Sequence, residues 1–251
     1  IEEDKRGTQL ILSRAHKNFV ESLFRAEVPE INEGIVEIMG ISRDPGGRTK
    51  IAVSSADSDI DAVGACVGMR GSRVQNIIQE LKGEKIDIVP WSPDSARFSC
   101  NALSPARVNK VILDESSKIM EVIVDEDQYS LCIGRRGQNV RLASELTQWE
   151  ITVKTDIQLK EEQQAVVKLL LTLPNISEVN ANLLFAGGYH TLEDIAFGES
   201  DSISKSSGIT NEEDISKIQL AARNALKDRL RNIEVNGDED NIEEDSEEKL
   251  S

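Results

Sequence analysis

Two pairs of glycines, with two residues between the members of each pair, are the part of the sequence best suited to chemistry. They enclose Met69 and Arg70 in the first pair, and Arg135 and Arg136 in the second. Glycine has no Cβ, so the backbone of another molecule can approach the main chain closely at these positions. If such a loop opens a helix, the free N–H groups and the positive end of the helix dipole attract phosphate. The pattern therefore indicates a site for the phosphates of a nucleic-acid backbone. The plainer alternative is a tight turn between two helices, with solvated arginines.

The two loops belong to an internal repeat. Residues 66–74 and 132–140 align at an offset of 66 positions, and Cys, Gly, Arg, Gly and Val recur in place. A single Gly-x-x-Gly is weak evidence, because two glycines at this spacing often mark an ordinary turn. Its repetition in a matched context favours a dedicated binding loop.

The elements that must position the loops also recur. Alternating apolar residues predict strands, and an i, i+3, i+4, i+7 apolar pattern predicts a helix after the first loop. Each unit reads strand, strand, helix, loop, helix, strand, with a further helix before it. The expected strands cover residues 34–38, 48–53 and 86–89 in the first unit and 108–113, 119–124 and 149–153 in the second; the preceding helices cover 16–26 and 92–102.

The charge is distributed unevenly along the chain. Of its 251 residues, 29 are Lys or Arg and 45 are Asp or Glu, for a net charge of −16. Residues 1–158 hold 20 basic and 25 acidic side chains, and residues 159–251 hold 9 and 20. The average charge argues against simple electrostatic capture of nucleic acid, but it leaves room for local basic patches. The stretch 234–248 has nine acids and no base, which predicts a disordered tail.

Several site classes are disfavoured. Cys66, Cys100 and Cys132 are spaced too widely for a zinc site or a disulfide framework and predict reduced, buried thiols. His16 and His190 have no partner ligand nearby, so we expect surface or capping roles. No metal, cofactor or catalytic group is expected, and there is no phosphate loop of the Gly-x-x-x-x-Gly-Lys type. No apolar run could span a membrane, and we expect a cytoplasmic monomer that is part of a longer chain.

The repeated Gly-x-x-Gly loops between helices resemble the KH domain, in which such a loop clamps about four nucleotides of single strand. The order of elements is similar to the type II, prokaryotic version. This resemblance implies an α+β fold with two tandem type II KH domains. It also implies that bases lie in an apolar groove beside each loop, so the low aromatic content of 4% is no obstacle.

Four strings extend the resemblance to the NusA family of bacterial transcription factors: residues 27–31, 44–50, 101–106 and 133–141. Residues 10–14 resemble the last strand of the OB-type RNA-binding domain that precedes the KH pair in that family. The domains expected from this resemblance are the end of a truncated OB-type domain at 1–14, KH domains at 15–90 and 91–157, a helical domain at 158–233 and the acidic tail at 234–251.

The helical domain is predicted to contain short helices and a helix-hairpin-helix-like segment at residues 179–196. The sequence Thr210-Asn211-Glu212-Glu213 predicts a capping box at the start of its last helix. Three roles remain open for this domain: docking to a protein or masking of the KH domains, a passive appendage, or contact with DNA.

The resemblance implies a non-enzymatic factor that binds nascent single-stranded RNA and modulates pausing, termination and antitermination. Its partners would be RNA, RNA polymerase (mainly through parts absent from this sequence) and, through the helical domain, a polymerase subunit or another Nus factor. The alternative is a ribosome-associated or RNA-processing KH protein. The residues expected to bind RNA are Gly68, Met69, Arg70, Gly71, Arg73, Gly134, Arg135, Arg136, Gly137, Gln138, Asn139 and Arg141.

Overall fold

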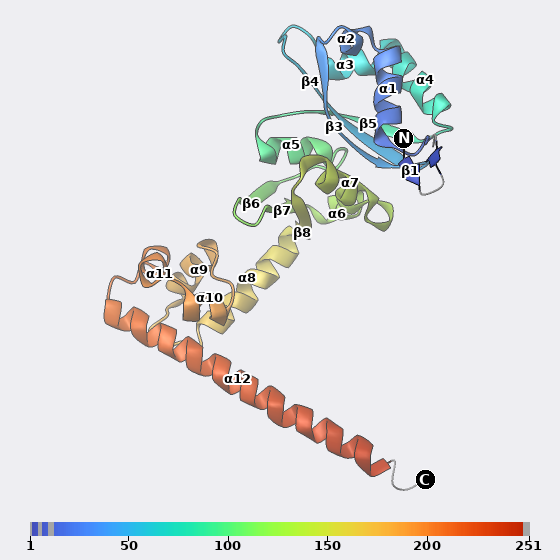
Figure 1. Cartoon of the computed structure of the whole chain (residues 1–251). Helices are drawn as coiled ribbons and strands as arrows, with labels where there is room; N and C mark the ends of the chain where they lie inside the picture. Colours follow the sequence, from blue (N-terminus) through green and yellow to red (C-terminus); the bar gives the residue numbers. More distant parts are fainter. Residues whose placement is uncertain (1, 5–6, 10–12, 248–251) are drawn as a thin grey trace. The chain divides into compact units, whose positions relative to one another are not determined.

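The computed structural model describes the backbone of residues 2–4, 7–9 and 13–247, and the side chains of residues 13–229 and 231. The chain forms two compact units, Ile1–Asp156 and Ile157–Ser251, which are shown in Figure 1. A short antiparallel hairpin of β1 (Glu2–Asp4) and β2 (Gly7–Gln9) opens the first unit. The strand expected at residues 10–14 falls largely on residues 10–12, outside the described residues, and residues 13–14 are not in a strand.

The first KH-like repeat is an α+β module in which four helices pack on one face of a three-stranded sheet. Sheet order is β3-β4-β5, with β3 antiparallel and β5 parallel to β4. Val20 and Phe24 of the first helix pack with Ile51 and Val53 of the central strand in one buried cluster. Its elements are α1 (Lys17–Glu27), α2 (Pro29–Asn32), β3 (Val36–Asp44), β4 (Arg48–Ser55), α3 (Ala62–Val67), α4 (Ser72–Glu80) and β5 (Lys85–Pro90).

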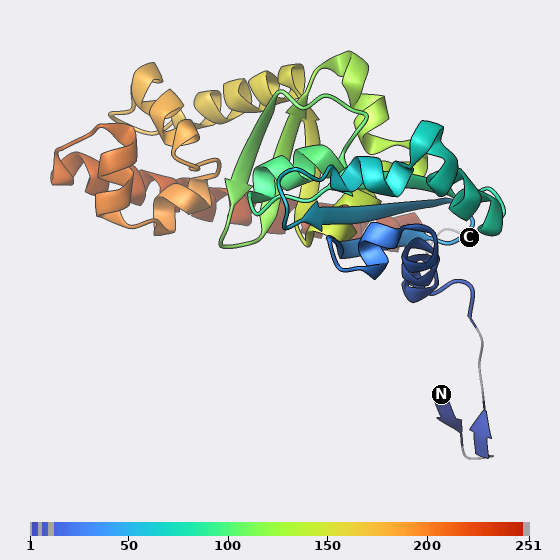
Figure 2. The same cartoon turned by 90° about the horizontal axis from the view of Figure 1, so that it is seen from above.

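The second repeat has the same topology, with sheet order β6-β7-β8. Its three strands lie side by side in Figure 2. Short helical turns, η1 (Met69–Gly71) and η2 (Arg135–Gly137), carry the two glycine loops. The remaining elements are α5 (Ser95–Ala102), β6 (Lys110–Asp114), β7 (Ile119–Val124), α6 (Glu126–Ile133), α7 (Gln138–Thr147) and β8 (Glu150–Thr155). The strand-strand-helix-loop-helix-strand order expected from the sequence is confirmed in both repeats.

Polar residues at the predicted helix starts cap the first turns. The Nδ1 atom of His16 accepts a hydrogen bond from the Asn18 N–H, which confirms a capping role for this histidine. Asp61 caps α3 in the same way, and Asp94 accepts bonds from two N–H groups at the start of α5. Such caps satisfy N–H groups that the helix itself leaves without partners.

The two repeats pack against each other through the outer face of the first sheet. Ala52 and Val89 from that face share a buried cluster with Phe98 and Leu146 of the second repeat. A Cβ on Gly40 would lie 3.3 Å from Leu146, so this glycine permits the close approach of α7. The two repeats are therefore one packed body.

Charged residues continue this seam. The Lys50 ammonium is fully buried and lies 3.0 Å from the Asp87 carboxylate, which also lies 3.5 Å from the Arg48 guanidinium. Burial lowers the pKa of Lys50 although Asp87 opposes the shift. A buried charge of this kind is tolerated only when it is paired, and Asp87 supplies the counter-charge for Lys50.

The second unit is all helical. Its buried cluster includes Leu170, Leu184, Ile195, Ile203 and Ile218, one from each helix. The helices are α8 (Asp156–Leu170), α9 (Glu178–Ala186), α10 (Leu192–Phe197), α11 (Ser200–Ser207) and α12 (Glu212–Glu247). The backbone of α12 is helical as far as Glu247 and so extends into the segment where the sequence predicts a disordered tail. Glutamate, which recurs there, is a good helix former even without an apolar face.

The predicted capping box at Thr210 is wrong. Asn211 is the residue whose side chain accepts from the Glu213 N–H and whose carbonyl accepts from Asp214 and Ile215. Asparagine is at least as good an N-cap as threonine, and the helix begins one residue later than expected. Capping boxes instead occur at Ser177 with Asn180 and at Thr191 with Asp194, which open α9 and α10.

Candidate nucleic-acid interface

The two glycine loops have nearly the same backbone. The first glycine has φ and ψ of 74° and 174° in loop 1 (68–71), and 74° and 173° in loop 2 (134–137). The third residue of each loop, Arg70 or Arg136, is left-handed with φ of 54° or 53°. Non-glycine residues seldom adopt this conformation, and it clusters at functional sites.

The two glycines of each loop are needed for different reasons. A Cβ on Gly134 would lie 2.9 Å from the backbone nitrogen of Asn139, and one on Gly68 would lie 2.6 Å from Arg73. The first glycine therefore lets the loop close against the following helix. A Cβ on Gly71 or Gly137 would meet nothing within 4 Å, so the second glycine faces open space that another molecule could enter.

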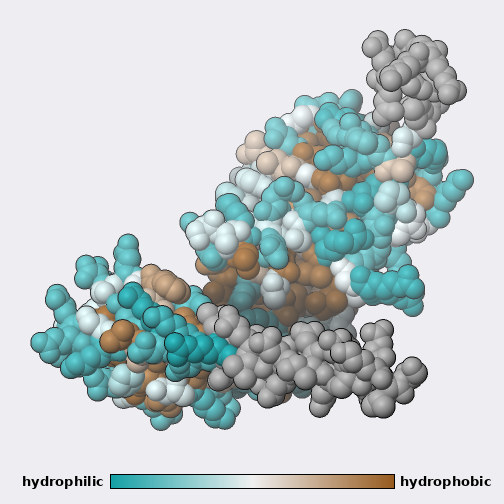
Figure 3. Space-filling model, turned by 60° about the horizontal axis from the view of Figure 1, so that its bottom comes forward, coloured by the Kyte–Doolittle hydropathy of each residue, from teal (hydrophilic) through white to brown (hydrophobic). Residues whose placement is uncertain are grey.

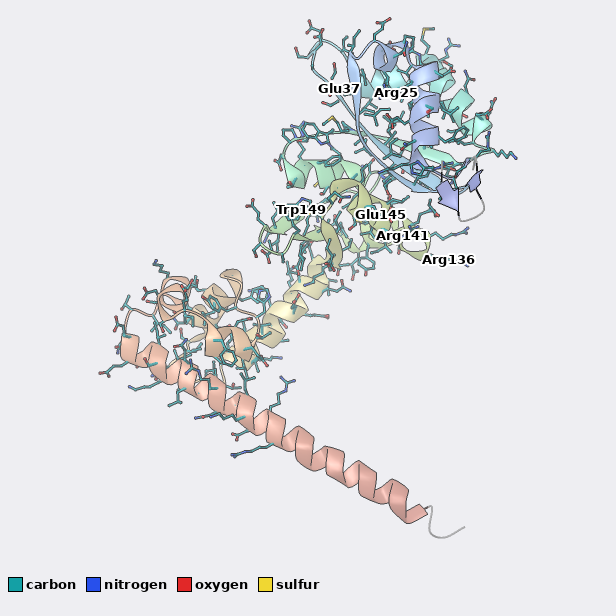
Figure 4. The ribbon with its side chains drawn as sticks, in the orientation of Figure 1. Arg25, Glu37, Arg136, Arg141, Glu145 and Trp149 are labelled. Atoms are coloured by element: carbon teal, nitrogen blue, oxygen red, sulfur yellow. The ribbon has the colours of Figure 1, made fainter. Side chains whose placement is uncertain are left out.

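The variable positions of the loops present donors to solvent. Arg70, Arg135 and Arg136 are exposed, and no ion pair engages them within the described part of the chain. Figure 4 shows Arg136 at the end of its loop. In the described residues the N–H groups of Met69 and Arg70 reach no backbone carbonyl. Unpaired N–H groups beside arginines form an anion-binding surface.

The arginines in the first helical turns are already paired. Arg73 is half-buried and donates to the Glu30 carboxylate at 2.8 Å and to the Ala65 carbonyl at 2.6 Å. The pKa of Glu30 is lowered by a backbone hydrogen bond, and the pairing with Arg73 adds to this shift. Arg73, which the sequence predicts to bind RNA, joins α4 to α2 and α3, and its partly exposed side chain also lines the hollow beside loop 1.

Arg141 is exposed and lies 3.4 Å from Asp44 of the first repeat and 3.3 Å from Glu145 of its own helix. Gln138 donates its side-chain amide to the same Asp44 carboxylate. Both residues therefore lie at the surface beside loop 2, as the sequence predicts, but in contact with an acidic residue that sequence reasoning did not connect to the site.

Asn139 does not lie at this surface. Its side chain is 2% exposed, and its amide donates to the carbonyls of Leu103 and Cys132 at 3.0 and 3.1 Å. The prediction of a direct RNA contact is therefore corrected. The internal repeat aligns Asn139 with Arg73, so in both repeats this position turns inward and ties the second helix to its neighbours.

A shallow hollow lies beside each loop. The hollow at loop 1 has a volume of about 520 Å³ and is lined by residues that include Glu30, Ala65, Met69 and Arg73. The hollow at loop 2 has a volume of about 680 Å³ and is lined by Asp44, Arg135, Arg136, Gln138 and Arg141. The Met69 side chain is 86% exposed and gives the first hollow an apolar rim that the second lacks. Exposed hydrophobic residues occur on both units (Figure 3).

The cysteines are free thiols; Cys66 and Cys132 are buried, as the sequence predicts, whereas Cys100 is only partly buried. Burial raises the pKa of Cys66 to about 12 and that of Cys132 to about 11. Both therefore remain protonated near neutral pH and are poor nucleophiles. Among the described residues, no three His, Cys, Asp or Glu side chains are grouped to hold a metal ion. No helix in that part of the chain is both long and apolar enough to cross a membrane.

The second unit contains the hairpin expected at residues 179–196. Its turn is held by Asp194, whose carboxylate accepts from the backbone N–H groups of His190 and Thr191 at 2.9 and 2.8 Å. The His190 ring stacks on Phe185 at 4.7 Å. The hairpin N–H groups that could meet a DNA phosphate are thus occupied by a carboxylate.

Comparison with known proteins places these features in one family. Residues 14–91 match the NusA-like first KH domain, and residues 95–161 match the NusA-like second KH domain. Proteins named transcription termination/antitermination protein NusA from Rickettsia prowazekii and Rickettsia conorii are 42% and 43% identical over 219 residues. These matches cover 84% of this chain and 44% of each relative, so the chain spans less than half the length of the relatives. With two NusA-like KH domains in tandem and this level of identity, the chain belongs to the NusA family.

Proposed function

We propose that the tandem KH body binds nascent single-stranded RNA through both glycine loops, as part of a factor that modulates pausing, termination and antitermination. The main support is that the same loop occurs twice in one packed body, each time with an open second glycine and unpaired arginines. The names of the relatives agree with this role. Contact with RNA polymerase would be made mainly by the parts of the relatives that this chain does not cover.

The binding mode follows from the backbone geometry. Phosphate contacts from arginines and N–H groups position a strand without reading its sequence. Bases next to the first loop would meet the apolar Met69, and those next to the second would meet only polar side chains. The first loop is therefore expected to tolerate close base packing, and the second to depend more on charge.

The salt dependence of RNA binding should reveal the phosphate contacts. A clamp that neutralises on the order of six phosphates predicts a slope of log affinity against log salt of roughly −4, at about −0.7 per phosphate of a single strand. Arg136→Ala should make the slope shallower by about 0.7. The measurement is fluorescence anisotropy with an oligoribonucleotide at several salt concentrations.

Arg25→Ala is the matched control, because Arg25 is also exposed but pairs with Glu21 on α1; Figure 4 shows it away from Arg136. It should leave the slope unchanged. An affinity that does not respond to salt would contradict a phosphate clamp.

We propose that the helical unit docks a protein, such as a polymerase subunit or another Nus factor, and does not contact nucleic acid. Its exposed apolar side chains support this: Val179 and Leu183 are 68% and 45% exposed on one face of α9, and Phe197 is 75% exposed. A chain with Val179→Ser and Leu183→Ser should capture less core RNA polymerase in a pull-down while its affinity for RNA is unchanged. Equal capture by both chains would contradict docking of a polymerase subunit through α9.

A further inference from the structure

An acidic residue of the first KH domain lies beside the second loop. Asp44 is the last residue of β3, and its carboxylate reaches the start of α7. There it accepts a hydrogen bond from Gln138 and lies 3.4 Å from the Arg141 guanidinium. Asp44 also lines the hollow beside loop 2, together with Arg135 and Arg136. Every other residue lining this hollow belongs to the second domain.

Asp44 is held in this place by contacts that do not involve the arginines of the loop. The buried Ser42 hydroxyl, on the same strand, donates to Glu145 of α7 at 2.8 Å. On the other side of the hairpin, Glu84 accepts from Arg43 and from the Gly46 N–H. These contacts fix the β3–β4 hairpin. The hairpin in turn places the Asp44 carboxylate beside the second loop.

The donors that Asp44 occupies are the ones that an RNA phosphate would use. Gln138 and Arg141 lie in the first turn of α7, where the helix dipole favours an anion. A carboxylate and a phosphate both accept from guanidinium and amide donors, so they compete when the donors are few. At the first loop the aligned residues Ser72 and Gln75 donate to no acidic side chain within the described residues, and the acid-paired donor there is Arg73, whose partner Glu30 belongs to the same domain.

We propose that Asp44 is a cross-domain competitor that lowers the affinity of the second loop for RNA phosphate. A strand that binds at loop 2 must displace this carboxylate from Arg141 and Gln138. The competition makes phosphate binding at the second loop weaker than the three nearby arginines would otherwise allow. At loop 1 the carboxylate in the corresponding hollow is Glu30 of the same domain, so the competitor contributed by the other domain is found at loop 2. The inference rests on the proposed RNA-binding function.

Asp44→Asn is the direct test, because asparagine keeps the shape and an oxygen that Gln138 can bond, but it has no charge. The full chain carrying this change should bind a mixed-sequence oligoribonucleotide of about ten nucleotides two- to fivefold more tightly at low salt. The modest size is expected because exposed ion pairs are weak. Glu37→Gln is the matched control, because it removes one negative charge from an exposed position near the other end of β3, and it should change affinity less than 1.5-fold (about 0.2 kcal/mol).

A double-variant cycle separates competition from a general gain of positive charge. If Asp44 acts by occupying Arg141, the gain from Asp44→Asn should shrink to that of Glu37→Gln in an Arg141→Ala background. An Asp44→Asn gain no larger than the control, or one that persists in full without Arg141, would overturn the inference. If the Asp44 inference fails in this way but loop substitutions still abolish RNA binding by the wild-type chain, the proposed function is upheld. A wild-type chain that binds no RNA would refute both the inference and the proposed function.

Discussion

Replacing Gly71 and Gly137 together by aspartate should lower the affinity for single-stranded RNA by about 100-fold or more. The space beyond both positions is open, so the new carboxylates would project where phosphates are expected to lie. Each lost charge-assisted hydrogen bond is worth roughly 1.5–3 kcal/mol, and the clamp would lose several at once. Anisotropy titration of the double variant against the wild type gives the ratio directly.

The same substitution should leave the fold intact. Both glycines have positive φ, 79° and 72°, and a side chain in this conformation costs roughly 1–2 kcal/mol at each position, less for aspartate and asparagine than for most residues. No buried contact is lost. Gly71→Asn with Gly137→Asn is the matched control, since asparagine has nearly the same size and backbone preference without the charge. We expect it to bind RNA between the wild type and the aspartate variant, with the same circular dichroism as both.

The second large effect concerns stability. Glu84→Ala should lower the free energy of unfolding of the first unit by roughly 3–5 kcal/mol, the range for a buried ion pair that loses one partner. The Glu84 side chain is 1% exposed and accepts from Arg43 at 2.8 and 2.9 Å, from the Gly46 N–H at 2.8 Å and from Thr49. Without it, the Arg43 guanidinium, 6% exposed, has no counter-charge.

Denaturant unfolding followed by tryptophan fluorescence suits this test, because Trp91 and Trp149 both lie in the first unit. Glu80→Ala is the control, since Glu80 pairs with Arg14 at an exposed site and should cost under about 1 kcal/mol. Equal unfolding free energies for the two variants would show that the Glu84 network does not stabilise the domain.

The pH dependence of the free energy of unfolding should reveal the contribution of Glu84. Burial alone would raise its pKa, but hydrogen bonds from Arg43, Thr49 and Gly46 outweigh this and lower the pKa below the ordinary 4.5. A carboxyl group with a lowered folded-state pKa stabilises the protein above its unfolded pKa, and this stabilisation is lost as pH falls through the folded value. Unfolding free energies measured between about pH 3 and pH 7 should therefore fall less steeply towards acid in Glu84→Gln than in the wild type.

Local patterns in the sequence predict the repeated architecture because they depend on near neighbours. Alternating apolar residues mark β5 and β8, short apolar runs mark β4 and β7, and the turn at residues 44–47 joins the first hairpin. The glycine loops are also predicted, because their conformation needs glycine at two fixed positions.

The pairing of side chains across elements could not be predicted in the same way. Arg73 and Asn139 look like surface donors after a phosphate loop, but tertiary contacts bury Asn139 and pair Arg73 with Glu30. Asp44 looks like an ordinary turn residue, because no residue near it in the sequence indicates that α7 lies against the outer face of the first sheet. The packing of Gly40 against Leu146 and the hydrogen bond from Ser42 to Glu145 bring these distant segments together.

The most direct test of the account is an NMR titration of the full chain with a single-stranded oligoribonucleotide of about ten nucleotides, following the backbone amides. We predict that the largest shifts occur at residues 68–71 and 134–137, that both loops respond to one strand at equal molar ratio, and that the shifts disappear in the Gly71→Asp, Gly137→Asp variant. Shifts confined to the helical unit, or to one loop at saturation, would contradict the claim that one RNA strand is bound by both loops.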